Sequence, residues 1–168
     1  MRAGTPGILI AAFLFTVLAL IAAVPMAYPA GTFVSLDGTT GVMDHGWSAG
    51  QFIYALGDMF CHQQTERSFM VNGSQTAFCA RDIGLIAGCA SGLLLTYGHA
   101  GKRPFTERKT MYAGSILISV MAAEWAAGAV LGYDWDMLRF AAGIIGGAGI
   151  AMVIQNIASE PWKGEGES

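Results

Sequence analysis

The chain has 168 residues, of which 54% are hydrophobic and 12% charged, with a mean hydropathy of +0.49. Soluble domains carry roughly 25% charged residues, so the low charge and the 23 glycines indicate an integral membrane protein. A net charge of −3 without a basic stripe argues against a nucleic-acid-binding protein. The length fits a single membrane domain over residues 1–168.

Four apolar segments predict membrane-spanning helices at about residues 8–27, 82–99, 111–131 and 138–157. The first segment also fits a secretory signal peptide, but its apolar run is long and its cleavage sites are poor, so we expect a retained span. The second segment is short, because its uncharged run at residues 83–97 extends only roughly 22 Å of a core of about 30 Å. It can span only if Arg81 and Asp82 enter the membrane, or if its other end runs past His99.

The distribution of basic residues predicts the orientation of these spans. The connection after the second span holds Lys102, Arg103, Arg108 and Lys109, which favours the cytoplasmic side. Residues 28–60 contain no Lys or Arg. We therefore expect an integral protein of the cell membrane, with both termini cytoplasmic and with residues 28–81 on the outer side.

The outer region, residues 28–81, has two features of its own. Residues 47–60 place apolar side chains on one helical face, which predicts an amphipathic helix on the membrane surface or a helix packed onto the bundle. Asn72-Gly73 predicts a short hairpin turn. The expected fold is all-α: an integral membrane bundle of four transmembrane helices, an amphipathic outer helix and a short polar outer loop.

The outer region ends in a cluster of potential metal ligands. Zinc takes four ligands from Cys, His and carboxylate side chains, and this segment offers Cys61, His62, Cys79 and Asp82. A carboxylate is a weaker, more exchangeable ligand than a thiolate, so an open or labile zinc site is the first interpretation. A Cys61–Cys79 disulfide, favoured by an oxidising outer face, and two reduced buried thiols are the alternatives.

Several polar residues are expected near the same face. Glu124 lies inside the third span, where a carboxylate is costly and indicates function. It is the candidate catalytic residue, as general base on a metal-bound water, with metal ligation or pairing to arginine as alternatives. The side chains that could bind an anionic substrate are Gln63, Arg67, Gln75, Arg81 and Arg139.

These motifs resemble a family of small archaeal and bacterial membrane proteins, catalogued as domain of unknown function 2085. The resemblance rests on residues 61–69 (CHQQTERSF), 73–75 (GSQ) and 79–81 (CAR), and more weakly on 121–124 (MAAE) and 139–143 (RFAAG). It covers roughly residues 50–145. The family usually has Cys where this chain has Asp82, which implies a site of three thiolates and one imidazole in the family. The resemblance implies a fold and a site but no reaction.

Two main hypotheses of function follow. The first is a metal-dependent membrane protein, a hydrolase that acts on an anionic or lipid-linked substrate by metal activation of water. The second is a non-enzymatic accessory subunit of a membrane complex, with a disulfide or a structural metal. A thiol–disulfide redox protein is weaker without a Cys-x-x-Cys pair, and a transporter needs more buried ionisable groups. The expected partners are the lipid bilayer and either complex subunits or further copies of the chain, with no nucleic acid.

Overall fold

The computed structural model describes residues 5–98, 107–133 and 135–159, and within these ranges the chain is mostly helical. The expectation of a mainly α-helical protein is confirmed. The elements in chain order are α1 (Thr5–Met26), the 3-10 turn η1 (Ala49–Gln51), α2 (Phe52–Phe60), the 3-10 turn η2 (Thr65–Arg67), β1 (Met70–Val71), β2 (Ser74–Gln75), α3 (Ala80–Gly98), α4 (Glu107–Leu131) and α5 (Asp136–Ser159).

Among the described residues, three helices are long and apolar enough to cross a membrane, by length and composition: Pro6–Met26, Arg108–Leu131 and Asp136–Ile157. They correspond to the first, third and fourth predicted spans. The helix α3 has 19 residues and begins with two charged side chains, Arg81 and Asp82, in its first turn. The four-span bundle is therefore supported for three helices, whereas a crossing by α3 stays a prediction.

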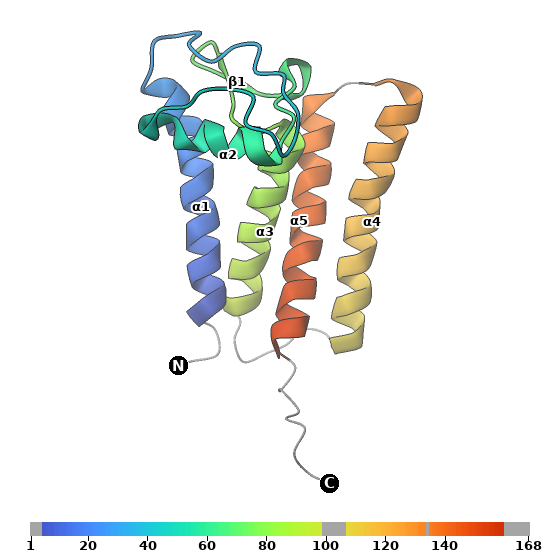
Figure 1. Cartoon of the computed structure of the whole chain (residues 1–168). Helices are drawn as coiled ribbons and strands as arrows, with labels where there is room; N and C mark the ends of the chain where they lie inside the picture. Colours follow the sequence, from blue (N-terminus) through green and yellow to red (C-terminus); the bar gives the residue numbers. More distant parts are fainter. Residues whose placement is uncertain (1–4, 99–106, 134, 160–168) are drawn as a thin grey trace.

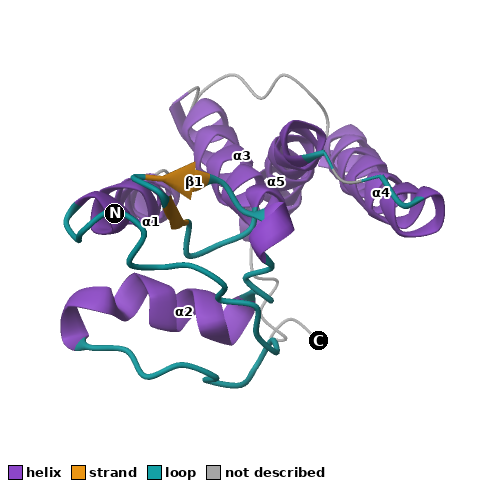
Figure 2. Cartoon of the chain, turned by 90° about the horizontal axis from the view of Figure 1, so that it is seen from above, coloured by secondary structure: helices purple, strands orange, loops and turns teal. Residues whose placement is uncertain are grey.

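The four long helices stand side by side in the order α1, α3, α5, α4 (Figure 1). Viewed along their axes they form an open row instead of a closed bundle (Figure 2). Residues 27–79, which we call the cap, gather at one end of this row, where α1 ends and α3 begins. The first turn of α1 and the last turn of α5 lie at the opposite end (Figure 1).

Glycines allow α3 and α5 to approach each other very closely. A Cβ atom added at Gly88 would lie 2.1 Å from the Ile144 carbonyl oxygen, and one at Gly147 would lie 2.2 Å from that of Leu85. Gly84 and Gly143 make equally close approaches to the backbone of the facing helix. Such small-residue interfaces bring helix backbones together where lipid supplies no hydrophobic driving force. This contact fixes the start of α3, and with it the position of Asp82.

The cap has its own aromatic core. Phe33 and Trp47 both stack on Tyr54, and their ring centroids lie 4.0 Å and 5.4 Å from that of Tyr54. The predicted hairpin is confirmed: β1 and β2 pair antiparallel, with Met70 opposite Gln75. Its two turn residues, Asn72 and Gly73, have φ values of 51° and 67°, as a tight hairpin requires.

The charges that predicted the orientation are only partly within the described residues. Arg108 and Lys109 lie in the first turns of α4, at the end of the row away from the cap (Figure 1). Arg2, His99, Lys102, Arg103 and Lys163 lie outside the described residues, as does the end of the second predicted span. The side of the membrane on which the cap lies therefore stays a prediction.

Candidate metal centre

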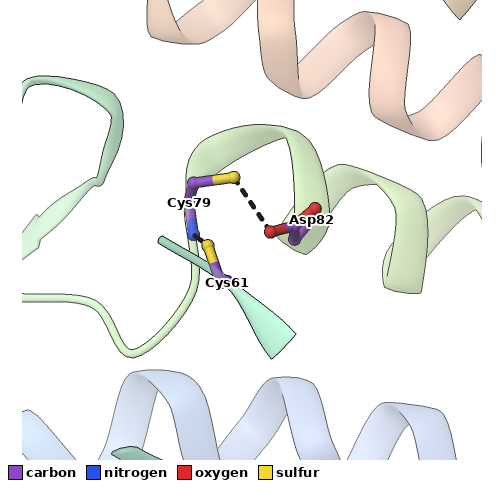
Figure 3. A group of neighbouring side chains, drawn as sticks. All are labelled: Cys61, Cys79 and Asp82. Carbon is purple, nitrogen blue, oxygen red and sulfur yellow. Dashed lines mark hydrogen bonds between the residues drawn. The ribbon is translucent and has the colours of Figure 1, made fainter. Parts of the chain in front are cut away.

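The ends of two helices bring Cys61, Cys79 and Asp82 together (Figure 3). Cys61 follows α2 directly, and its backbone N–H donates to the Gly57 carbonyl at 2.7 Å. Cys79 directly precedes α3, and its carbonyl accepts the first helical hydrogen bond from Ile83 at 3.1 Å. Asp82 lies in the first turn of α3, where the partial positive charge of a helix N-terminus favours a carboxylate.

Contacts among the three residues are short. The two thiol sulfurs and a carboxylate oxygen of Asp82 all lie within 4.8 Å of one another. The Cys79 backbone N–H donates to the Cys61 sulfur at 3.3 Å, and the Cys79 thiol donates to Asp82 Oδ2 at 3.0 Å. Both cysteines are free thiols in this structure, so the sulfurs are near each other but not bonded. The predicted Cys61–Cys79 disulfide is therefore not confirmed.

The two thiols differ in acidity. The interaction of its sulfur with the Cys79 side chain lowers the pKa of Cys61 below its usual value, against the opposing effects of burial and of the Asp82 charge. The same interaction between the two cysteines, together with burial and the Asp82 carboxylate, raises the pKa of Cys79. Cys61 is thus the first of the pair to become a thiolate, which is the form that binds metals.

The donor set fits a divalent metal with a preference for sulfur. In tetrahedral zinc sites the Zn–S distance is about 2.3 Å, which separates two thiolate ligands by roughly 3.8 Å. Ligand atoms within 4.8 Å of one another need only a small inward movement to reach that geometry. The thiol protons must leave when the ion binds, and this removes the hydrogen bond from Cys79 to Asp82.

His62, the fourth predicted ligand, is not brought into this group. Cys61 is extended, with φ −133° and ψ 150°, and successive side chains of an extended segment point to opposite sides. The His62 ring is exposed, and its Nδ1 lies 2.7 Å from the Thr40 hydroxyl. Within the described residues the group therefore offers three candidate ligands.

Residues 61–153 of the chain match the family model described as "Predicted membrane protein (DUF2085)". The chain belongs to the DUF2085 family. The DUF2085 match begins at Cys61 and includes the metal-ligand candidates, Glu124 and Arg139, so the resemblance noted from the sequence is confirmed. Comparisons with curated proteins and with solved structures find no match.

Two of the predicted substrate-binding residues of this DUF2085 protein, Gln63 and Gln75, are fully buried in the cap. Gln63 Nε2 donates to the Ala77 carbonyl at 2.9 Å, and Gln75 Nε2 donates to the Gln63 carbonyl. Gln75 Oε1 accepts from the Thr65 hydroxyl at 3.1 Å. In this arrangement both amides satisfy backbone and loop groups that burial would otherwise leave without partners.

The charged candidates lie partly among the long helices and partly in the cap. Arg81 Nη2 donates to Glu124 Oε2 at 2.9 Å, and the two side chains are only 19% and 8% exposed. This confirms the pairing alternative for Glu124 and joins α3 to α4. Arg139 is buried on α5, whereas Arg67 is exposed with its Nε 3.9 Å from Glu66. Removing one partner of a buried ion pair destabilises a protein, because it leaves the other charge without compensation.

A second polar cluster in the cap was not predicted. Asp58 is buried and accepts hydrogen bonds from the Trp47 indole at 3.0 Å and from the His45 ring and backbone at 3.2 Å and 3.0 Å. Burial raises the pKa of Asp58, but the hydrogen bonds from Trp47 and His45 outweigh it, and the pKa lies below its usual value. The position of Asp58 one helical turn after the buried Tyr54 was the feature that could have indicated this burial.

Proposed function

We propose that this DUF2085 protein binds a divalent metal ion, zinc, through Cys61, Cys79 and Asp82. The observation that carries the proposal is the approach of two sulfurs and one carboxylate oxygen to within 4.8 Å. Thiolates select zinc and other soft or borderline ions over magnesium and calcium.

The first role that we propose for this ion is to fasten the cap to the bundle. Cys61 directly follows α2, Cys79 directly precedes α3, and Asp82 lies in the first turn of α3. An ion shared by these ligands would connect the two helices through metal–ligand bonds. In this role the protein is a structural or accessory component of the membrane.

A metal-dependent hydrolase is the second candidate, favoured by the three-ligand set. Catalytic zinc sites use three protein ligands and leave the fourth position to a water that the ion activates. The substrate would be an anionic or lipid-linked molecule. Glu124 and Arg81 would act as a pair, since Oε2 of Glu124 accepts from Arg81, and Oε1 has no hydrogen-bond partner in the part of the chain that the structure describes. Arg139 would add a second positive charge to this pair from α5.

His62 distinguishes a closed site from an open one. As a fourth ligand it would have to leave Thr40 and turn its backbone, because it now points away from the sulfurs. The variant His62→Gln should therefore keep its metal if the fourth position belongs to water. A loss of metal comparable to that of Cys61→Ser would assign His62 as a ligand and close the site.

We also propose that the cap lies on the outer side of the cell membrane in a single domain. The cap has no Lys or Arg before Arg67, while Arg108 and Lys109 lie at the other end of the row. This follows the positive-inside rule. A membrane-impermeant protease added to intact cells should cleave the loops of the cap and leave the start of α4 intact; the opposite pattern would reverse the orientation.

The decisive experiment measures metal content and free thiols on the purified full-length chain. We expect about one metal per chain, and reaction of Cys61 and Cys79 with a thiol reagent only after chelation. Cys79→Ser and Asp82→Ala should lose the metal, whereas the matched control Cys89→Ser should retain it, since Cys89 packs in α3 with apolar neighbours.

Three other results would contradict the proposal. Metal-free protein with reactive Cys61 and Cys79 would leave two packed thiols. Metal-free protein with Cys89 as the one titratable thiol would establish a disulfide instead. An unchanged zinc affinity in Asp82→Cys would remove Asp82 from the ligand set, because a thiolate in its place should bind zinc more tightly.

A further inference from the structure

The helix α2 carries an apolar face that nothing in the described chain covers. Phe52, Met59 and Phe60 are 46%, 47% and 68% exposed. With the half-buried Leu56 they recur at the spacing of one helical face. An exposed aromatic and methionine face of this kind marks a surface that contacts lipid or a partner.

The opposite face of α2 is already used inside the cap. Its buried residues are Ile53, Tyr54, Gly57 and Asp58. Asp58 is the one charged residue of this helix, and its carboxylate is held by Trp47 and His45. The exposed face of α2 therefore has no charged side chain to favour water over an apolar environment.

The position of α2 identifies what covers this face. The helix lies across the row of long helices, level with the ends of α1 and α5, and the loops of the cap lie above it (Figure 1). The view along the axes places α2 beside the row, not over its centre (Figure 2). Both α1 and α5 are apolar enough to span a bilayer. The helix α2 therefore lies at the depth where these two helices emerge from the bilayer.

We propose that α2 inserts its exposed face, Phe52, Leu56, Met59 and Phe60, into the lipid leaflet on the cap's side. It thus acts as an interfacial anchor that lies in the plane of the membrane. None of these four side chains is a candidate metal ligand. Because Cys61 follows Phe60 directly, however, the anchor also fixes the metal centre at the level of the lipid headgroups.

A photo-crosslinking experiment tests the anchor. The full-length chain is prepared with benzophenone-alanine at position 60, and in a second variant at position 59, and reconstituted in phosphatidylcholine vesicles. Ile116, exposed in the span α4, is the lipid-facing reference, and Glu66, exposed in the cap, is the water-facing reference. After irradiation, mass spectrometry identifies what is attached to each position.

We expect lipid adducts at positions 59 and 60 in yields like those at position 116, and no lipid adduct at position 66. Links between two copies of the chain at positions 59 and 60 would overturn the proposal and assign the face to a homo-oligomer. No lipid adduct at either position, with adducts retained at position 116, would overturn it in favour of a water-exposed face. Each variant is scored only from protein that elutes as a single species. The lipid-adduct yield of the position 116 variant, prepared in parallel, is the reference for positions 59 and 60.

Discussion

The contact between α3 and α5 predicts that Gly88→Ala will damage the fold although Ala is the better helix former. The added Cβ would meet the Ile144 carbonyl oxygen at 2.1 Å and the Ile144 Cα and carbonyl carbon at 2.8 Å each. These are backbone atoms, so no rotation of a side chain can relieve the overlap. The two helices must move apart along their whole glycine-lined contact.

The magnitude follows from two opposing terms. Overpacking a tight site costs about 1–3 kcal/mol and occasionally more, and a backbone clash at this distance belongs at or above the upper end. The gain in helix propensity from Gly to Ala is only about 1 kcal/mol. A net loss of about 2 kcal/mol should lower Tm by roughly 4–8 °C for a chain of this size.

Gly128→Ala is the matched control, because it makes the same chemical change in a helix without the clash. Its nearest neighbouring atom would lie 3.7 Å away, in ordinary van der Waals contact. The propensity gain should therefore leave its Tm unchanged or raise it by about 2–4 °C. The two variants are compared by thermal unfolding in detergent. The quantity measured after heating is the fraction of chain that still elutes as a single species. Equal Tm values for Gly88→Ala and Gly128→Ala would refute the packing argument.

Three further changes probe the charged and polar contacts. Glu124→Gln should destabilise the protein by about 3–5 kcal/mol, because it leaves the Arg81 charge buried without a partner; adding Arg81→Met should recover part of this loss in thermal unfolding, and a purely additive loss would mean that the pair is not coupled. The pKa of Asp58 is lowered, since hydrogen bonds to its carboxylate outweigh burial, so its contribution is present above about pH 4 and is lost as pH falls through the folded pKa; Tm of the wild type should therefore fall more on acidification than that of Asp58→Asn, and equal falls would contradict this. Chelation should lower Tm of the wild type and leave that of Asp82→Ala unchanged, whereas an equal loss in both would exclude a metal held by Asp82.

Hydropathy predicted the long helices well but not their ends. The third predicted span starts at residue 111, whereas α4 starts at Glu107 and includes Arg108 and Lys109. An apolar run marks the part of a helix that suits the membrane core. Helical hydrogen bonds continue through the polar residues that follow it, and composition cannot show where they stop.

Three of the four candidate ligands named from the sequence, Cys61, Cys79 and Asp82, lie together in the structure. Cys79 and Asp82 are separated by one helical turn, so a helix that begins at Ala80 necessarily brings them to one side. Cys61 and His62 were expected to act together as neighbours in sequence. The chain is extended where α2 ends, and alternation of side chains in extended backbone separates them.

The buried polar groups of the cap could not be assigned from sequence. Gln63 and Gln75 were expected to bind substrate because their side-chain amides can donate hydrogen bonds. In the structure these amides donate to backbone carbonyls that the packed loops bury. Asp58 and His45 are distant in sequence and meet because the loop before α2 folds back over that helix. Which polar side chains serve the fold depends on how loops cross, and this is not encoded in local periodicity.

The metal and the lipid anchor would act on the same equilibrium. Cys61 directly follows α2 and Cys79 directly precedes α3, so metal ligation restricts the intervening residues 62–78 and holds α2 against the bundle. An ion that binds only this docked arrangement stabilises it by about 4.1 kcal/mol when its concentration is roughly 1,000 times Kd. Insertion of the exposed face of α2 into lipid favours the same arrangement. Because such couplings are reciprocal, the membrane that holds α2 should also strengthen metal binding at Cys61.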